Sequence, residues 1–139
     1  MKVLVDTSVW SLALRKKILT EEELKVVKEL KELIYELRVL LIGPIHQELL
    51  SGISNEISFK NLKEKMGAFE DVEIISSDYE RAAEIFNECR KNGIQGSHID
   101  YLICSVAINN ELSIFTTDKD FNNFQNIFDL KLHQIREEV

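Results

Sequence analysis

MKVLV at residues 1–5, followed directly by Asp6-Thr7-Ser8, is the stretch from which we infer the fold. The five residues form a largely apolar run that is typical of a buried strand. In an open α/β sheet, ligands bind at the edge formed by the carboxyl ends of the strands. Asp6 follows this first strand without a gap, so we expect its carboxylate at that edge.

Further short apolar runs predict the other strands, and helical patterns separate them. The runs lie at 39–42, 72–75 and 112–115, with an edge-like fifth strand at 130–135. Strands that alternate with helices indicate a parallel sheet with helices on both faces. The sequence contains no repeat, low-complexity tract or linker, so residues 1–139 predict one α/β domain.

Capping residues and apolar periodicity predict the helices. Thr20 and Glu23 form a capping box for a helix to about residue 38, and Ser77 and Glu80 form a second one. Ser97 caps a third helix, which is apolar nearly all round and therefore expected to be buried. On the first of these helices we assign a solvated face to Lys25, Lys28, Glu29 and Lys31. Further helical or turn segments are expected at 7–14, 45–50, 59–69 and 121–128.

The composition is that of an ordinary globular protein, with 45% hydrophobic and 29% charged residues. No apolar run approaches the roughly 20 residues of a membrane span. The first residues lack the long apolar region of a signal peptide. Cys89 and Cys104 lack CxxC spacing, which favours a reducing cytoplasm over a disulfide framework.

The net charge of the chain is negative, with 17 basic against 24 acidic residues and a formal value of −7. Proteins that bind nucleic acid usually present a basic stripe, so this charge argues against such a role. The argument weakens if several acids form a metal site, because divalent cations offset their charge. Composition therefore does not decide between these functions.

Four acids are expected at the same edge of the sheet. Asp6 ends the first strand and Asp118 follows the fourth, while Glu48 lies early in the helix after the second strand. Asp100 lies in the first turn of the buried helix, and it joins the others only if the loop at 93–97 returns the chain to this edge. Converging carboxylates repel one another unless a cation lies between them. Oxygen ligands of this kind suit Mg²⁺ or Mn²⁺.

Each acid also has a simpler explanation. Asp6 could cap the following helix, Asp100 could complement a helix dipole, and Asp118 could be an ordinary turn residue. Glu48 alone is typical of a helix surface. The placement of Asp6 and Asp118 at one edge makes a joint site the better interpretation.

The histidines are not expected to act as ligands. His46 and His98 lie two residues before Glu48 and Asp100, and residues at that spacing do not share a helix face. His133 falls in the expected last strand, where we interpret it as neutral background.

Three motifs and one acid make the chain resemble the PIN-domain family, in particular its VapC-type ribonuclease toxins. The resemblance covers nearly the whole chain and is carried by Val3-Leu4-Val5-Asp6-Thr7-Ser8, Gly96-Ser97-His98-Ile99-Asp100-Tyr101-Leu102-Ile103, Phe115-Thr116-Thr117-Asp118-Lys119-Asp120-Phe121 and Glu48 after Pro44-Ile45. It implies a five-stranded parallel sheet with helices on both faces. It also implies hydrolysis of RNA phosphodiester bonds with one or two Mg²⁺ or Mn²⁺ ions.

The resemblance assigns roles to individual residues of this chain. Asp6, Asp100 and Asp118 are the expected principal metal ligands, and Glu48 binds a second metal or orients water. No single general base is assigned. Residues expected around the site are Thr7, Thr117 as a hydroxyl neighbour, and Asp120 as a peripheral acid that caps the segment at Phe121.

The resemblance also implies partners: an RNA substrate, a VapB-type antitoxin that fills a groove and blocks the site, and a second copy in a homodimer. Trp10, Leu14 and the helix at 20–38 are candidates for the groove, with core packing as the alternative for each. Candidate RNA contacts are Arg15, Lys16, Lys17 and Lys119.

Other functions remain as alternatives. Response-regulator receivers carry paired acids after the first strand, whereas Asp6 is followed by Thr7 and Ser8 in this chain. Haloacid-dehalogenase-type phosphatases carry Asp-x-Asp there, and Ser8 occupies the position of the second aspartate. Both are disfavoured for that reason. A catalytically silent PIN fold that binds RNA or protein, and a housekeeping RNA-processing PIN nuclease, stay open.

Overall fold

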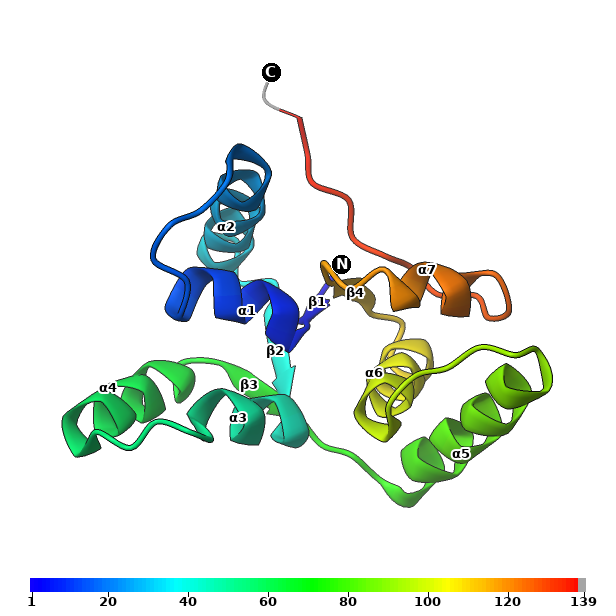
Figure 1. Cartoon of the computed structure of the whole chain (residues 1–139). Coiled ribbons are helices and arrows are strands. Elements are labelled where there is room, and N and C mark those ends of the chain that lie inside the picture. Colours follow the sequence, from blue (N-terminus) through cyan, green and yellow to red (C-terminus); the bar gives the residue numbers. More distant parts are fainter. Residues whose placement is uncertain (138–139) are drawn as a thin grey trace.

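The structure is a computed structural model and describes residues 1–137. Its centre is a parallel sheet with the strand order β3-β2-β1-β4 (Figure 1). The strands are β1 (Val3–Val5), β2 (Val39–Ile42), β3 (Glu70–Val72) and β4 (Ser113–Phe115). β1 lies inside the sheet, and its three residues have no exposed surface. The first apolar run of the sequence is therefore the centre of the hydrophobic core.

Helices cover both faces of the sheet, as the alternation of strands and helices predicted. They are α1 (Thr7–Leu14), α2 (Glu21–Tyr35), α3 (Gly43–Leu50), α4 (Glu56–Met66), α5 (Ser76–Lys91), α6 (His98–Asn109) and α7 (Asp120–Gln125). Figure 1 shows α1 and α2 on one side of the sheet and α5 and α6 on the other. Among the described residues, no helix is both long and apolar enough to cross a membrane.

α6 is the most deeply buried helix, as its composition predicted. Every residue from 101 to 107 is buried. Ser105 is among them, and its hydroxyl donates to the carbonyl of Asp78 at 2.6 Å, which satisfies the polar group inside the core. The burial fixes α6 against the sheet and so determines where its first turn lies.

The expected fifth strand is wrong in extent, since the sheet of the described chain has four strands. Within 130–135, a single parallel bridge joins Leu132 to Ile114 beside β4. His133 Nε2 then contacts Glu29 Oε2 on α2 at 2.6 Å, and the Arg136 Nε–H donates to the same oxygen at 3.0 Å. The segment thus pairs with β4 only around Leu132, and the side chains of His133 and Arg136 then hold it against α2.

Two expectations about polar residues are also wrong. Glu29 is buried, with 5% of its surface exposed, because the C-terminal segment covers it. The second capping box does not use Ser77 and Glu80: the Asp78 carboxylate accepts from the Ile75 N–H at 2.9 Å. Asp78 is also buried, and Asn109 donates to it at 2.7 Å. It joins the start of α5 to α6.

Candidate metal centre

The register of β1 and β4 places Asp6 beside Thr116. Val5 pairs with Phe115, and the Asp6 N–H donates to the Phe115 carbonyl at 2.9 Å. Asp6 precedes α1 in the N-cap position, yet its side chain makes no capping hydrogen bond. Its Oδ2 instead accepts from the Thr116 hydroxyl at 2.8 Å and from Ser8 Oγ at 2.8 Å. The Asp6 side chain is thus fixed by two hydroxyl groups at the carboxyl edge of the sheet.

The hydroxyls of Ser8 and Thr116 connect Asp6 to the turn after β4. The Thr117 N–H donates to Ser8 Oγ at 3.0 Å, and the Asp118 N–H donates to Thr116 Oγ1 at 3.0 Å. Sequence reasoning missed both residues and named Thr117 as the hydroxyl neighbour. Thr117 is exposed and contributes its backbone amide to this network. The signal for Ser8 and Thr116 was that each hydroxyl residue lies two positions from an expected site acid, Asp6 or Asp118, at two adjacent strand ends.

The loop before α6 returns the chain to this edge. Gly93 has a positive φ of 71°, as expected for a residue just after a helix. Gly96 passes so close to the aromatic rings beneath it that an added Cβ would lie 2.7 Å from Phe124 Cζ and 2.9 Å from Tyr101 Cζ. Ser97 and Asp100 then form a complete capping box at 3.1 Å in both directions. The loop geometry and this cap together position the Asp100 carboxylate.

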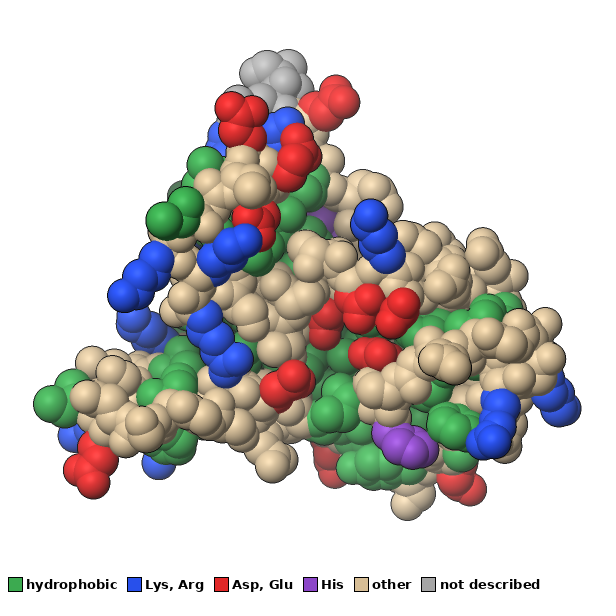
Figure 2. Space-filling model, viewed as in Figure 1, with side chains coloured by type: hydrophobic (Ala, Val, Ile, Leu, Met, Phe, Trp, Pro, Cys, Tyr) green, Lys and Arg blue, Asp and Glu red, His purple; other side chains and the backbone are tan. Residues whose placement is uncertain are grey.

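Three acids converge where α6 meets the turn after β4. Asp100, Asp118 and Asp120 each present a carboxylate oxygen, and these oxygens lie within 4.8 Å of one another. The Asp120 N–H donates to Asp118 Oδ1 at 2.9 Å, which folds the turn over Asp118. Figure 2 shows acidic side chains gathered at the centre of this face. Asp120, which the sequence interpretation left peripheral, therefore belongs to the cluster.

Electrostatics at the cluster favour a bound cation. Burial raises the pKa of Asp100, and the negative charges of Asp118 and Asp6 raise it further, against hydrogen bonds with Ser97 that lower it. Within residues 1–137, no lysine or arginine forms a salt bridge with any of these acids. Close carboxylates without a basic partner are a donor set that fits Mg²⁺ or Mn²⁺.

Glu48 lies outside this three-acid cluster. Its side chain is exposed on α3, and its Oε2 accepts from the Thr7 hydroxyl at 3.0 Å. The Arg15 guanidinium donates to the carbonyls of Glu48 and Leu49 at 3.1 and 2.8 Å, so it ties the end of α1 to α3. Thr7 thus links Glu48 to the start of α1, directly after Asp6.

Of the residues expected to contact partners, some already make contacts within the fold and others are exposed. Trp10 is buried and packs edge-on against Phe69 at 5.3 Å between ring centroids, so it belongs to the core. Leu14, one turn later, is 40% exposed. Lys16 forms an ion pair with Glu23 at 2.6 Å.

The histidines also have distinct surroundings. His46 Nδ1 lies 3.0 Å from the Asp71 carboxylate, and the ring of His98 stacks on Phe86. The interpretation of His133 as neutral background is wrong, because its side chain contacts buried Glu29 and holds the C-terminal segment on α2.

Fold and site together define a class: a parallel α/β domain with an acidic centre at the carboxyl edge of its sheet. The family model described as PIN domain matches residues 3–127, and the chain therefore belongs to the PIN domain family. The resemblance found in the sequence motifs is confirmed at this level.

Several solved structures have a similar fold. A chain of FitAcB from Neisseria gonorrhoeae is 22% identical with a TM-score of 0.70, covering 95% of this chain and 96% of that chain. A chain of VapBC2 from Rickettsia felis, in a structure bound to a promoter DNA fragment, is 19% identical with a TM-score of 0.75. The match covers 96% of this chain and 98% of that chain. A chain of VapBC-5 from Mycobacterium tuberculosis, a member of the VapBC family of toxin-antitoxin systems, is 16% identical with a TM-score of 0.66. The match covers 94% of this chain and 96% of that chain. A comparison with curated proteins found no match.

Proposed function

We propose that the chain is a metal-dependent endoribonuclease that hydrolyses RNA phosphodiester bonds and acts as the toxin of a VapBC-type pair. The observation that carries this proposal is the convergence of Asp100, Asp118 and Asp120 within 4.8 Å. Membership of the PIN domain family supports it, as does the similarity of the fold to chains in VapBC and FitAcB structures.

Asp6, Asp100, Asp118 and Asp120 are the residues that would hold Mg²⁺ or Mn²⁺. When bound, such an ion supplies Lewis-acid chemistry that activates water and neutralises charge developing on the phosphate. The chain contributes preorganisation, because the hydrogen bonds from Ser8 and Thr116 fix the orientation of Asp6 before any ligand arrives. Fixed ligands avoid the cost of ordering side chains during the reaction.

Glu48 has a separate proposed role at the rim of the site. Its carboxylate accepts from Thr7, and Arg15 holds its backbone from the other side. A carboxylate fixed in this way orients water or contacts a second ion, and it does not belong to the three-acid cluster. We therefore expect Glu48 to affect the rate of cleavage more than the binding of the first ion.

The proposed partner is an antitoxin of the VapB type. Leu14, Ile18 and Leu24 expose 40%, 86% and 54% of their surfaces along α1, the following loop and the start of α2. α1 packs against α2, and apolar side chains left exposed on neighbouring elements can contribute to a surface for a protein partner. We assign this surface to the antitoxin. We also propose that the toxin itself is a homodimer.

The test uses purified chain, free of any partner, with total cellular RNA. We expect cleavage with Mg²⁺ or Mn²⁺, none with EDTA, and none for Asp6→Asn or Asp118→Asn, with circular dichroism to verify folding. Asp129→Asn is the control, because Asp129 is exposed outside the cluster. RNA binding without cleavage by the wild type would favour the silent binding module. Cleavage restricted to one precursor RNA, without growth arrest on expression, would favour a housekeeping nuclease.

A further inference from the structure

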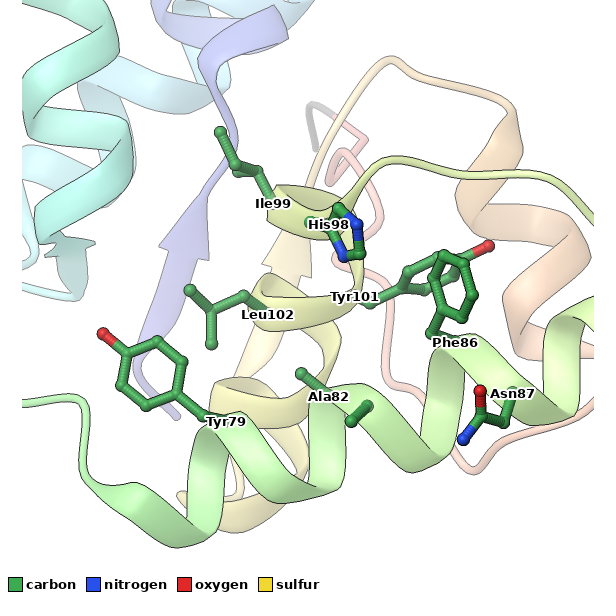
Figure 3. A pocket seen from close by; sticks show the side chains of 9 residues that line it. Tyr79, Ala82, Phe86, Asn87, His98, Ile99, Tyr101 and Leu102 are labelled. Carbon is green, nitrogen blue, oxygen red and sulfur yellow. The ribbon is translucent and has the colours of Figure 1, made fainter.

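A second feature, a pocket between α5 and α6, lies near the acidic centre. α5 and α6 enclose a pocket of about 310 Å³ with mostly apolar walls (Figure 3). Phe86 lies on the α5 side, and His98 and Ile99 lie on the α6 side. The proposed nuclease site does not use this pocket, so its role requires a separate explanation.

The pocket and the acidic centre share the first turn of α6. His98 and Ile99 line the pocket and immediately precede Asp100, which belongs to the acidic cluster. One turn of helix rises about 5.4 Å, so both features lie within reach of one extended ligand. Figure 2 shows hydrophobic side chains on the α5 and α6 part of the face that also carries the acidic side chains.

The pocket offers an aromatic surface with unengaged polar groups. The His98 ring stacks on Phe86 with 5.1 Å between centroids and 7° between planes, and His98 is exposed. The lining also includes Tyr79 and Asn87 but contains no aspartate, glutamate, lysine or arginine. Among residues 1–137, no hydrogen bond engages the side chains of Tyr79, Asn87 or His98. Flat apolar walls and free donors and acceptors, without net charge, match the chemistry of a nucleobase.

We infer that this pocket accepts an unpaired base of the RNA, from a nucleotide beside the one whose phosphate lies at the acidic centre. The inference rests on the proposed function, and what it adds is the assignment of this pocket as a subsite for one base. Proteins recognise single-stranded RNA by stacking bases on aromatic and histidine rings. Stacking is needed here because a chain of net charge −7 gains little attraction from the RNA backbone.

The first experiment measures base preference. Wild type and His98→Ala cleave a pool of random 12-nucleotide single-stranded RNAs with Mn²⁺, and the new ends are sequenced. We expect a base preference at one position beside the cut in the wild type, flattened by about tenfold in His98→Ala. Tyr35→Ala is the control, because Tyr35 is an aromatic residue on α2 with 87% of its surface exposed. It should leave the preference unchanged.

A second experiment is independent of cleavage. Fluorescence anisotropy in EDTA compares a labelled single-stranded RNA with the same strand carrying one abasic nucleotide. We expect the abasic strand to bind the wild type about tenfold more weakly, and both strands to bind His98→Ala equally. Base-dependent binding in this experiment, together with no RNA cleavage by the wild type when Mg²⁺ or Mn²⁺ is added, would refute the nuclease proposal and still support the pocket assignment.

Two outcomes would overturn the inference. One is cleavage with the same base preference in His98→Ala and wild type, which would leave the nuclease proposal intact. The other is a change of oligomeric state in Tyr79→Ser, measured by light scattering, with RNA binding unaltered. Tyr79 is 56% exposed at the edge of the pocket, so that result would identify this face as an interface between protein copies.

Discussion

The hydroxyl of Thr116 donates to Asp6 Oδ2 at 2.8 Å and also accepts the N–H of Asp118 at 3.0 Å. One side chain thus fixes the acid after β1 relative to the acid after β4. Because the two strands are adjacent and parallel, this contact follows from their register. The relative positions of the two carboxylates therefore depend on a residue that carries no charge.

Thr116→Val tests this dependence, since it removes the hydroxyl and preserves the shape of the side chain. We expect Mn²⁺ affinity and RNA cleavage to fall by about 10–100-fold, the range seen when a residue that orients a ligand is lost. Mn²⁺ binding is measured by electron paramagnetic resonance and cleavage with a labelled RNA. Thr117→Val is the matched comparison, because Thr117 contributes its backbone amide, and its variant should retain wild-type affinity. Equal losses in both variants would contradict the assignment.

Asp120 provides a second prediction, because the structure places it in the cluster with Asp100 and Asp118. Replacing a carboxylate by an amide removes a charge that offsets the bound cation. We therefore expect Asp120→Asn to weaken Mn²⁺ binding as much as Asp118→Asn, measured by calorimetry. If Asp120→Asn binds Mn²⁺ as tightly as the Asp129→Asn control, then Asp120 is peripheral, as the motif alone suggested.

Gly96 tests the loop that places α6. In Gly96→Ala the new methyl group would lie 2.7 Å from Phe124 and 2.9 Å from Tyr101, so the loop must move. Overpacking of this kind costs about 1–3 kcal/mol, which we expect as a lower urea midpoint together with reduced cleavage. Gly43→Ala is the control, because no atom lies within 4 Å of its added methyl group and its stability should not fall. A wild-type urea midpoint for Gly96→Ala would show that the loop yields without cost.

The sheet-edge acids were predictable because they depend on local patterns and on one rule of topology. An apolar run followed by an acid marks a strand end, and parallel strands bring their ends to one edge. Asp6 and Asp118 follow from that rule alone. The participation of Asp120 depends on the conformation of one turn, and the roles of Ser8 and Thr116 depend on side-chain rotamers, neither of which periodicity reveals.

The fifth strand and Glu29 could not be predicted for a different reason. Glu29 lies among lysines on α2, a pattern that normally indicates a solvated face. It is buried because His133, 104 residues away in the sequence, packs against it. Contacts between distant segments are not visible in the local sequence pattern of either segment. The burial of Glu29 could therefore not be predicted, and neither could the shortening of the expected fifth strand to one bridge at Leu132.

This contact leads to a prediction about pH. Burial raises the pKa of Glu29, but hydrogen bonds from His133 and Arg136 outweigh that effect and hold the pKa below its ordinary value of 4.5. A carboxyl group with a lowered pKa in the folded state stabilises the protein above its unfolded pKa. That contribution is lost as the pH falls through the folded pKa. Arg136 also pairs with Glu36 at 2.8 Å, so Glu36 titrates in the same cluster.

Glu29→Gln should therefore lower the free energy of unfolding by about 1.5–3 kcal/mol at neutral pH, the usual value of hydrogen bonds to a charged group. Urea unfolding from pH 7 down to pH 3 is the measurement. The gap between wild type and variant should close as the pH falls below 4.5, because the wild type then loses the contribution of ionised Glu29. Glu64→Gln on α4 is the control, because Glu64 is exposed and its variant should match the wild type throughout. A gap that persists at pH 3 would mean that Glu29 acts through packing, and that its charge does not hold the C-terminal segment on α2.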